Sequence, residues 1–124
     1  MKQRTINLLN KYNLNKSLEE ELKTKSVFEL MSLKGIGPET MDDWSSTLEK
    51  ERRWKVFWEV CTIQDAKRLK YELIKAKRVY KHRKFMFIKY GVKTDILIEN
   101  IESIKERIQS FCEDSPELKE IFKL

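Results

Sequence analysis

The sequence of 124 residues is poor in the residues that interrupt helices or bind metals, with 3 Gly, 2 Pro, 2 Cys and 1 His. No Gly or Pro occurs between Pro38 and Gly91, which favours long helices over a sheet interrupted by turns. Cys61 and Cys112 fit neither a metal-binding spacing nor a disulfide framework, so we expect a reducing, intracellular (cytoplasmic) location. With one histidine, the chain lacks a zinc ligand set, and we expect no metal and no cofactor.

Long apolar runs are also lacking. None approaches the roughly 20 residues that cross a bilayer, and residues 1–4 lead into no signal-peptide core, so we expect no membrane partner. The length suits one domain or two very small ones and excludes a large enzyme with a separate cofactor domain. A hydrophobic fraction of 40%, with 3 Trp, 4 Tyr and 6 Phe, argues against intrinsic disorder.

The net charge of +6 is unevenly distributed along the chain. Residues 1–50 hold 8 basic and 8 acidic side chains, residues 51–93 hold 14 and 4, and residues 94–124 hold 4 and 8. The densest basic stretch, Lys75 to Lys84, is typical of a polyanion-binding surface. The alternative is a solvated helix whose charge pairs with the acidic C-terminal segment, although that segment could neutralise only part of it.

The first 50 residues predict several short helices. Ser17 and Ser26 are expected to cap two of them, with Glu20 as the capping-box partner of Ser17, and Pro38 suits the first turn of another. Apolar residues at helical spacing predict the buried faces: Ile6, Leu8, Leu9, Tyr12, Leu18, Leu22, Val27, Leu30, Met31, Met41, Trp44 and Leu48.

The central segment predicts helices whose limits the pattern leaves open. Trp54, Phe57, Trp58 and Cys61 form a helical stripe, although the same stretch also alternates like a buried strand. Its three aromatic residues are expected to be core. Thr62 and Asp65 indicate the start of a helix with a stripe from Ile63 to Tyr80. Residues 85–88 fit either a short strand or the apolar end of that helix.

The C-terminal part predicts two helices. Thr94 is expected to cap the first, and its apolar residues alternate by 4 and 3, as in a helix packed along its length or a short coiled-coil seam. Those residues are Leu97, Ile101, Ile104, Ile108 and Phe111. Ser115-Pro116-Glu117 indicates the start of a last short helix.

The string Leu33 to Thr40 is the most specific motif in the chain. Gly35 and Gly37 allow a tight turn whose N–H groups, with the N-terminus of the next helix, can face one phosphate. Ile36 is expected to enter the core and fix the turn. Lys34 and Thr40 can add side-chain contacts to the same phosphate.

With the preceding residues 26–32, this string resembles the helix-hairpin-helix family over residues 26–48, or 6–48 if an earlier helix pair completes the unit. Similar units occur in DNA repair proteins, in recombinase N-terminal domains and in the C-terminal domain of the RNA polymerase alpha subunit. The resemblance implies sequence-independent contact with a DNA backbone through the hairpin amides at Gly35, Ile36 and Gly37. The chain departs from the family pattern at bulky Met41 and Trp44 and at acidic Glu39, Asp42 and Asp43. These departures leave a scaffolding or protein-binding hairpin as the alternative.

The string also looks like the hairpin of the base-excision glycosylases. Where bifunctional members of that group carry a catalytic lysine, this chain has Glu39, and where they carry a catalytic aspartate it has Phe57. The pocket for a flipped base needs a longer chain. His82 lies in the basic block with no nucleophile nearby. We therefore expect no enzymatic activity.

The resulting expectation is a mostly α protein, with a helix-hairpin-helix-like unit over 1–50 packed on a basic helical part over 51–124. The alternative is α+β with short strands near 54–61 and 84–90. Aromatic residues interleave with Lys and Arg, which suits stacking on single strands or RNA but also a helix that buries one face. They are Tyr71, Tyr80, Phe85 and Tyr90.

The expected function is non-enzymatic nucleic-acid binding with little sequence specificity, with DNA favoured over RNA. The alternative is a small regulatory protein that binds a protein of the transcription or replication machinery. Lys, Asn and Ile richness is associated with AT-rich genomes such as those of phages or viruses. The predicted contacts are Lys34, Gly35, Ile36, Gly37, Thr40, Lys67, Arg68, Lys70, Lys75, Lys77, Arg78, Lys81, Arg83 and Lys84.

Overall fold

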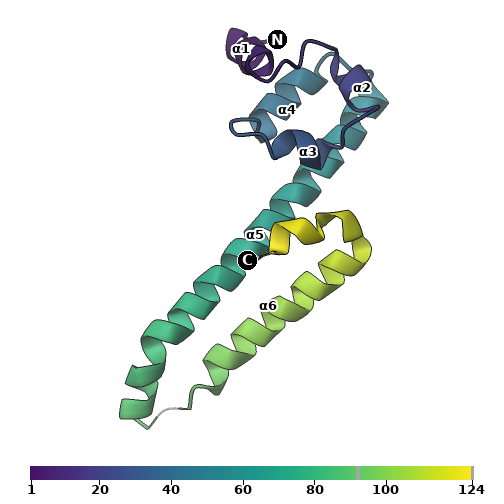
Figure 1. The fold of residues 1–124 in the computed structure, drawn as a ribbon. Coiled ribbons are helices and arrows are strands. Elements are labelled where there is room, and N and C mark those ends of the chain that lie inside the picture. Colours follow the sequence, from purple (N-terminus) through teal and green to yellow (C-terminus); the bar gives the residue numbers. More distant parts are fainter. Residues whose placement is uncertain (92, 124) are drawn as a thin grey trace. The chain divides into compact units, whose positions relative to one another are not determined.

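The computed structural model describes residues 1–91 and 93–123, most of which are helical and none of which lies in a strand (Figure 1). The prediction of a mostly α fold is confirmed. Of the segments 54–61 and 84–90 that the α+β alternative placed in strands, the first lies within α5 and the second lies in α5 up to its last residue, Lys89. Among these residues, no helix combines the length and apolar character needed to cross a bilayer. The elements are α1 (Gln3–Lys11), α2 (Leu18–Glu21), α3 (Val27–Met31), α4 (Pro38–Ser45), α5 (Lys50–Lys89), α6 (Asp95–Asp114) and the 3₁₀ helix η1 (Pro116–Phe122).

The chain forms two compact units, Met1–Ile63 and Gln64–Leu124. Residue 50, where the sequence placed a division, is the first residue of α5, and α5 contributes to both units. The expected helix start at Thr62 and Asp65 is wrong, because α5 continues unbroken through both positions. The physical reason is that no Gly or Pro interrupts this stretch, so a weak N-terminal signal inside it does not end a helix.

Local sequence signals define the short helices of the first unit. The Ser17 hydroxyl accepts a hydrogen bond from the Glu20 N–H at 3.3 Å, and the Ser26 hydroxyl accepts one from the Glu29 N–H at 3.1 Å. Both predicted caps are confirmed, and Pro38 is the first residue of α4 as expected. Each cap satisfies an N–H that the helix itself leaves unpaired.

The core of the first unit gathers the apolar faces of these short helices. Its fully buried side chains are Trp44, Leu18, Leu30, Met41 and Val27, all of which the helical spacing placed on inner faces. The segment of α5 that belongs to this unit buries Val56, Val60 and Ile63. Burial of large side chains of this kind is the main stabilising term in a small helical unit.

The second unit contains a helical hairpin. Leu73 and Ala76 of α5 form a buried cluster with Ile104 of α6, and Ile101 and Ile108 pack against it. These α6 residues belong to the predicted alternating stripe, which confirms that this stripe faces a neighbour. Thr94 occupies the N-cap position of α6, but its side chain makes no capping hydrogen bond.

The last predicted helix is present as η1, with Pro116 at its start. Leu118 and Ile121 of η1 are buried. The ring of Phe122 lies edge to face with that of Phe111 in α6, with centroids 5.9 Å apart. This T-shaped geometry is the one that aromatic quadrupoles favour, and it fixes η1 on α6.

We expect Gly35→Ala to destabilise the first unit by about 1–2 kcal/mol, because Gly35 has a φ of +92° and an added Cβ would lie 3.2 Å from Cδ1 of Leu8. Gly37→Ala is the matched control, since an added Cβ at this position would meet no atom within 4 Å and its φ is −110°. Thermal unfolding followed by circular dichroism measures both. Equal effects of the two substitutions would contradict the strained turn at Gly35.

Candidate nucleic-acid interface

The hairpin between α3 and α4 has the geometry of a tight turn fixed from inside. Gly35 adopts a left-handed conformation, with a φ of +92°. Ile36 is buried to 2% exposure, which confirms that it enters the core. Gly37 is extended and forms the N-cap of α4, directly before Pro38. The backbone of this turn is also tied down by the Tyr12 hydroxyl, which donates to the Lys34 carbonyl at 2.6 Å.

The hairpin offers fewer free donors than the family resemblance implies. The Ile36 N–H donates to the Leu33 carbonyl at 3.1 Å, so it is already paired. The Thr40 hydroxyl points back toward the Gly35 carbonyl, at 3.5 Å. Within residues 1–91 and 93–123, the N–H groups of Gly35 and Gly37 donate to no backbone oxygen. Two amides without a backbone acceptor and the exposed Lys34 side chain are therefore the candidate phosphate donors of the hairpin.

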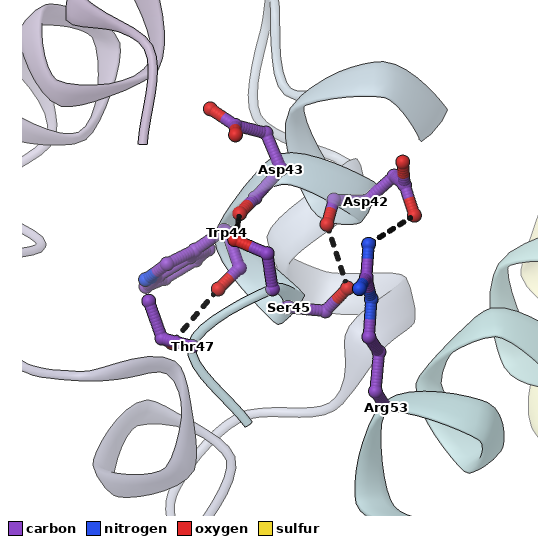
Figure 2. Close-up of polar contacts among 7 residues, drawn as sticks. Asp42, Asp43, Trp44, Ser45, Thr47 and Arg53 are labelled. Carbon is purple, nitrogen blue, oxygen red and sulfur yellow. Dashed lines mark hydrogen bonds and ion pairs between the residues drawn. The ribbon is translucent and has the colours of Figure 1, made fainter. Parts of the chain in front are cut away.

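The acidic residues next to the hairpin are used within the first unit. The Arg53 guanidinium of α5 lies 3.4 Å from the Asp42 carboxylate, as Figure 2 shows. The Asp43 carboxylate accepts a hydrogen bond from the Lys2 N–H at 3.0 Å. The Thr5 hydroxyl and this Lys2 N–H hold the pKa of the Asp43 carboxyl below its usual value, because both stabilise its charged form. These two carboxylates link α4 to α5 and to the start of α1.

The predicted basic residues lie along α5 within the second unit. Most are exposed, and two are half-buried. Of the half-buried pair, Lys70 donates to the Lys123 carbonyl at 3.2 Å, and Lys84 places its ammonium 5.8 Å from the ring centroid of Tyr80 and 5.3 Å from that of Phe85. The exposed members are Lys67, Arg68, Lys75, Lys77, Arg78, Lys81 and Arg83.

Among the described residues, the acidic C-terminal helices form no salt bridge with this basic set. Between α5 and α6, the ion pair joins Glu72 of α5 to Arg107 of α6 at 3.2 Å, so the acid lies on the basic helix and the base on the acidic one. In the part of the chain that the structure describes, no salt bridge involves any Lys or Arg from position 67 to position 84. The alternative of a charge-paired basic helix therefore lacks structural support.

The expectation that Trp54, Phe57 and Trp58 form core is wrong. Their side chains are 58%, 47% and 57% exposed. The rings contact one another instead, with centroids 5.5 Å apart for Trp54 and Phe57 and 5.9 Å apart for Trp54 and Trp58. The inner face of this helix segment belongs to β-branched residues at positions 56, 60 and 63, whose spacing of 4 and 3 was the signal that the larger aromatic side chains obscured.

An open cavity of about 700 Å³ lies beside this aromatic cluster. Its lining surface is mostly apolar because of Trp54 and Phe57, and its lining residues also include charged ones of both signs. The charged lining residues are Asp42, Lys50, Glu51, Arg53 and Lys55. Exposed clusters of tryptophan and phenylalanine beside charges of both signs are typical of protein-binding surfaces.

The hairpin residues Lys34 to Thr40 belong to the first unit, and the basic residues from Lys67 to Lys84 belong to the second. The described residues contain no group of three or more His, Cys, Asp or Glu side chains placed to hold a metal ion. Comparisons with known protein families, with curated proteins and with solved structures give no match to this chain.

Proposed function

We propose that the chain binds nucleic acid without catalysing a reaction, and that α5 of the second unit supplies most of the binding energy. The observation that carries this proposal is the set of exposed Lys and Arg side chains between positions 67 and 84 that no described carboxylate neutralises. Such side chains bind phosphates and release condensed counterions, and this mode of binding requires no contact with a specific base. Weak sequence preference follows from this mode of binding.

The hairpin has a secondary role in this proposal. The amides of Gly35 and Gly37, which have no backbone acceptor among the described residues, can contact one phosphate at the start of α4 together with Lys34. The acidic residues Asp42 and Asp43 are held by Arg53 and by the start of α1, which supports such a role for the hairpin. One such contact adds register and orientation, while the larger number of basic side chains on α5 sets the affinity.

A salt titration tests the proposal. We expect the logarithm of the association constant for a DNA duplex to fall linearly with the logarithm of salt concentration, with a slope of about −4 to −6 for five or six phosphate contacts. Fluorescence anisotropy with a labelled oligonucleotide measures this slope. An affinity that hardly changes between low and high salt would show that α5 does not bind through phosphates.

The exposed cluster of Trp54, Phe57 and Trp58 favours a second candidate function, the docking of a protein partner by the first unit. The two candidates separate by mutation. If the chain binds nucleic acid, charge reversal on α5 removes the binding of nucleic acid, and replacement of Trp54 and Trp58 by alanine leaves that binding intact. If the first unit docks a protein partner, the alanine substitutions remove the binding of that partner, and charge reversal on α5 leaves it intact.

A further inference from the structure

We propose that the outer face of α5 in the second unit binds single-stranded nucleic acid, with Tyr71 and Phe85 stacking on unpaired bases between phosphate-binding cations. This inference rests on the proposed function and names its ligand. This face, here called the outer strip, consists of residues that follow one another at alternating intervals of three and four positions. Its members are Arg68, Tyr71, Lys75, Arg78, His82, Phe85 and Lys89.

The outer strip lies on the side of α5 opposite its buried residues. At 3.6 residues per turn, a position two residues away is on nearly the opposite face, and Leu73 stands in that relation to both Tyr71 and Lys75. Leu73 is buried against α6, whereas every member of the outer strip is exposed. Tyr71 and Phe85 are 65% and 69% exposed. Neither ring therefore serves the packing of α5 on α6.

The outer strip carries no acidic residue. Between Gln64 and Lys89 the acids are Asp65 and Glu72, and the Glu72 carboxylate is paired with Arg107 of α6. An amphipathic helix normally places charged and polar residues on its solvent side. Two large aromatic rings among basic residues on that side suit a ligand with both anionic and flat apolar parts. A nucleotide has both.

The geometry favours unpaired bases over a duplex. The faces of bases in a duplex are covered by their neighbours, whereas the bases of a single strand can stack on exposed aromatic rings while cations hold the phosphates. Tyr71 and Phe85 are separated by fourteen residues, or about 21 Å along a helix. That length corresponds to about six nucleotides at ~3.4 Å each. The Lys84 ammonium lies over one face of the Phe85 ring, 5.3 Å from its centroid, so a base would stack on the other face next to this charge.

A lipid surface fits the outer strip less well. A helix that lies on a membrane presents a continuous apolar face, whereas here cations separate the two rings over four turns. Exposed Met86 and Ile88 lie close to Phe85 in the sequence but far from Tyr71. A membrane contact would therefore depend on Phe85 and not on Tyr71, and this difference makes the two ligands distinguishable.

The test compares binding of the full chain to labelled oligo(dT), oligo(rU) and a DNA duplex of equal length by fluorescence anisotropy. We expect the double variant Tyr71→Ala, Phe85→Ala to weaken both single-strand complexes about tenfold per ring and to leave duplex binding unchanged. Tyr71→Trp with Phe85→Trp should retain single-strand affinity. Ile96→Ala is the matched control, because Ile96 on α6 is 71% exposed and lies outside the outer strip.

Several outcomes would overturn the inference. Equal losses on single strands and duplex, or no loss from the double alanine variant, would exclude stacking, and the proposed function would stand if Arg78→Glu still weakened binding. Binding of phosphatidylserine vesicles that depends on Phe85 alone, without oligonucleotide binding, would assign the face to a membrane. Absence of wild-type binding to all three oligonucleotides would overturn the proposed function as well.

Discussion

Arg78→Glu, Arg83→Glu and Lys84→Glu together are expected to weaken DNA binding by two to three orders of magnitude at about 0.1 M salt. Loss of three phosphate contacts reduces the salt slope by about three, and each contact contributes roughly eightfold at that salt concentration. None of the three side chains takes part in a salt bridge within the described residues, so their replacement breaks no internal ion pair. Anisotropy titrations over a range of salt concentrations measure the affinity and the slope.

The matched control for this charge reversal is Arg4→Glu, Lys11→Glu and Lys16→Glu. These three side chains are exposed and belong to the first unit, and their replacement changes the net charge of the chain by the same amount. We expect a loss of less than about tenfold from the control, because these three side chains do not belong to the basic residues of α5 to which the binding is assigned and would act only through weak, salt-screened charge effects. Similar losses in both triple variants would show that binding follows net charge alone and that α5 forms no defined interface.

Trp44→Ala is expected to unfold or severely destabilise the first unit, by about 3–5 kcal/mol. The Trp44 side chain is 1% exposed and is the largest of the fully buried side chains, so its removal leaves a cavity in the core of Leu18, Leu30 and Met41 that cannot close completely. For a unit of this size, such a loss lowers the melting temperature by well over about 10 °C. Thermal unfolding followed by far-UV circular dichroism measures it.

Trp58→Ala is the control for this prediction, because it removes the same kind of side chain from a position that is 57% exposed. We expect a change within about 0.5 kcal/mol, from the contact of Trp58 with the Trp54 ring. A destabilisation by Trp58→Ala equal to that of Trp44→Ala would mean that the aromatic cluster of α5 is packed in the folded protein.

Local signals in the sequence were sufficient to mark the starts of α2, α3 and α4. Ser17, Ser26 and Pro38 mark helix starts by chemistry that acts over three residues, and Gly35 with Ile36 defines a turn in the same way. Such features need no knowledge of distant neighbours, because a cap or a left-handed residue has the same requirement in any fold. The hairpin half of the candidate site was therefore predictable in position.

Features that depend on partners distant in sequence were harder to predict. Either stripe of the segment from Trp54 to Ile63 can be the buried one by spacing alone, and tertiary packing selects Val56 and Val60 over the tryptophans. The hydrogen bond of the Ile36 N–H and the orientation of Asp42 and Asp43 are likewise visible only in the folded unit. Counts of acidic and basic residues along the sequence also left open whether the acidic C-terminal segment pairs with the basic side chains of α5.

The tryptophans at positions 44, 54 and 58 all belong to the first unit, one buried and two exposed. Intrinsic emission therefore combines a shielded fluorophore with two that water and dissolved quenchers can reach. The second unit contains tyrosines and no tryptophan, so its unfolding has no tryptophan signal of its own. Placing one tryptophan at Tyr71 or Phe85, with exposed Trp54 and Trp58 replaced by phenylalanine and buried Trp44 kept, would leave the new residue as the exposed fluorophore and give the outer face of α5 an optical reporter.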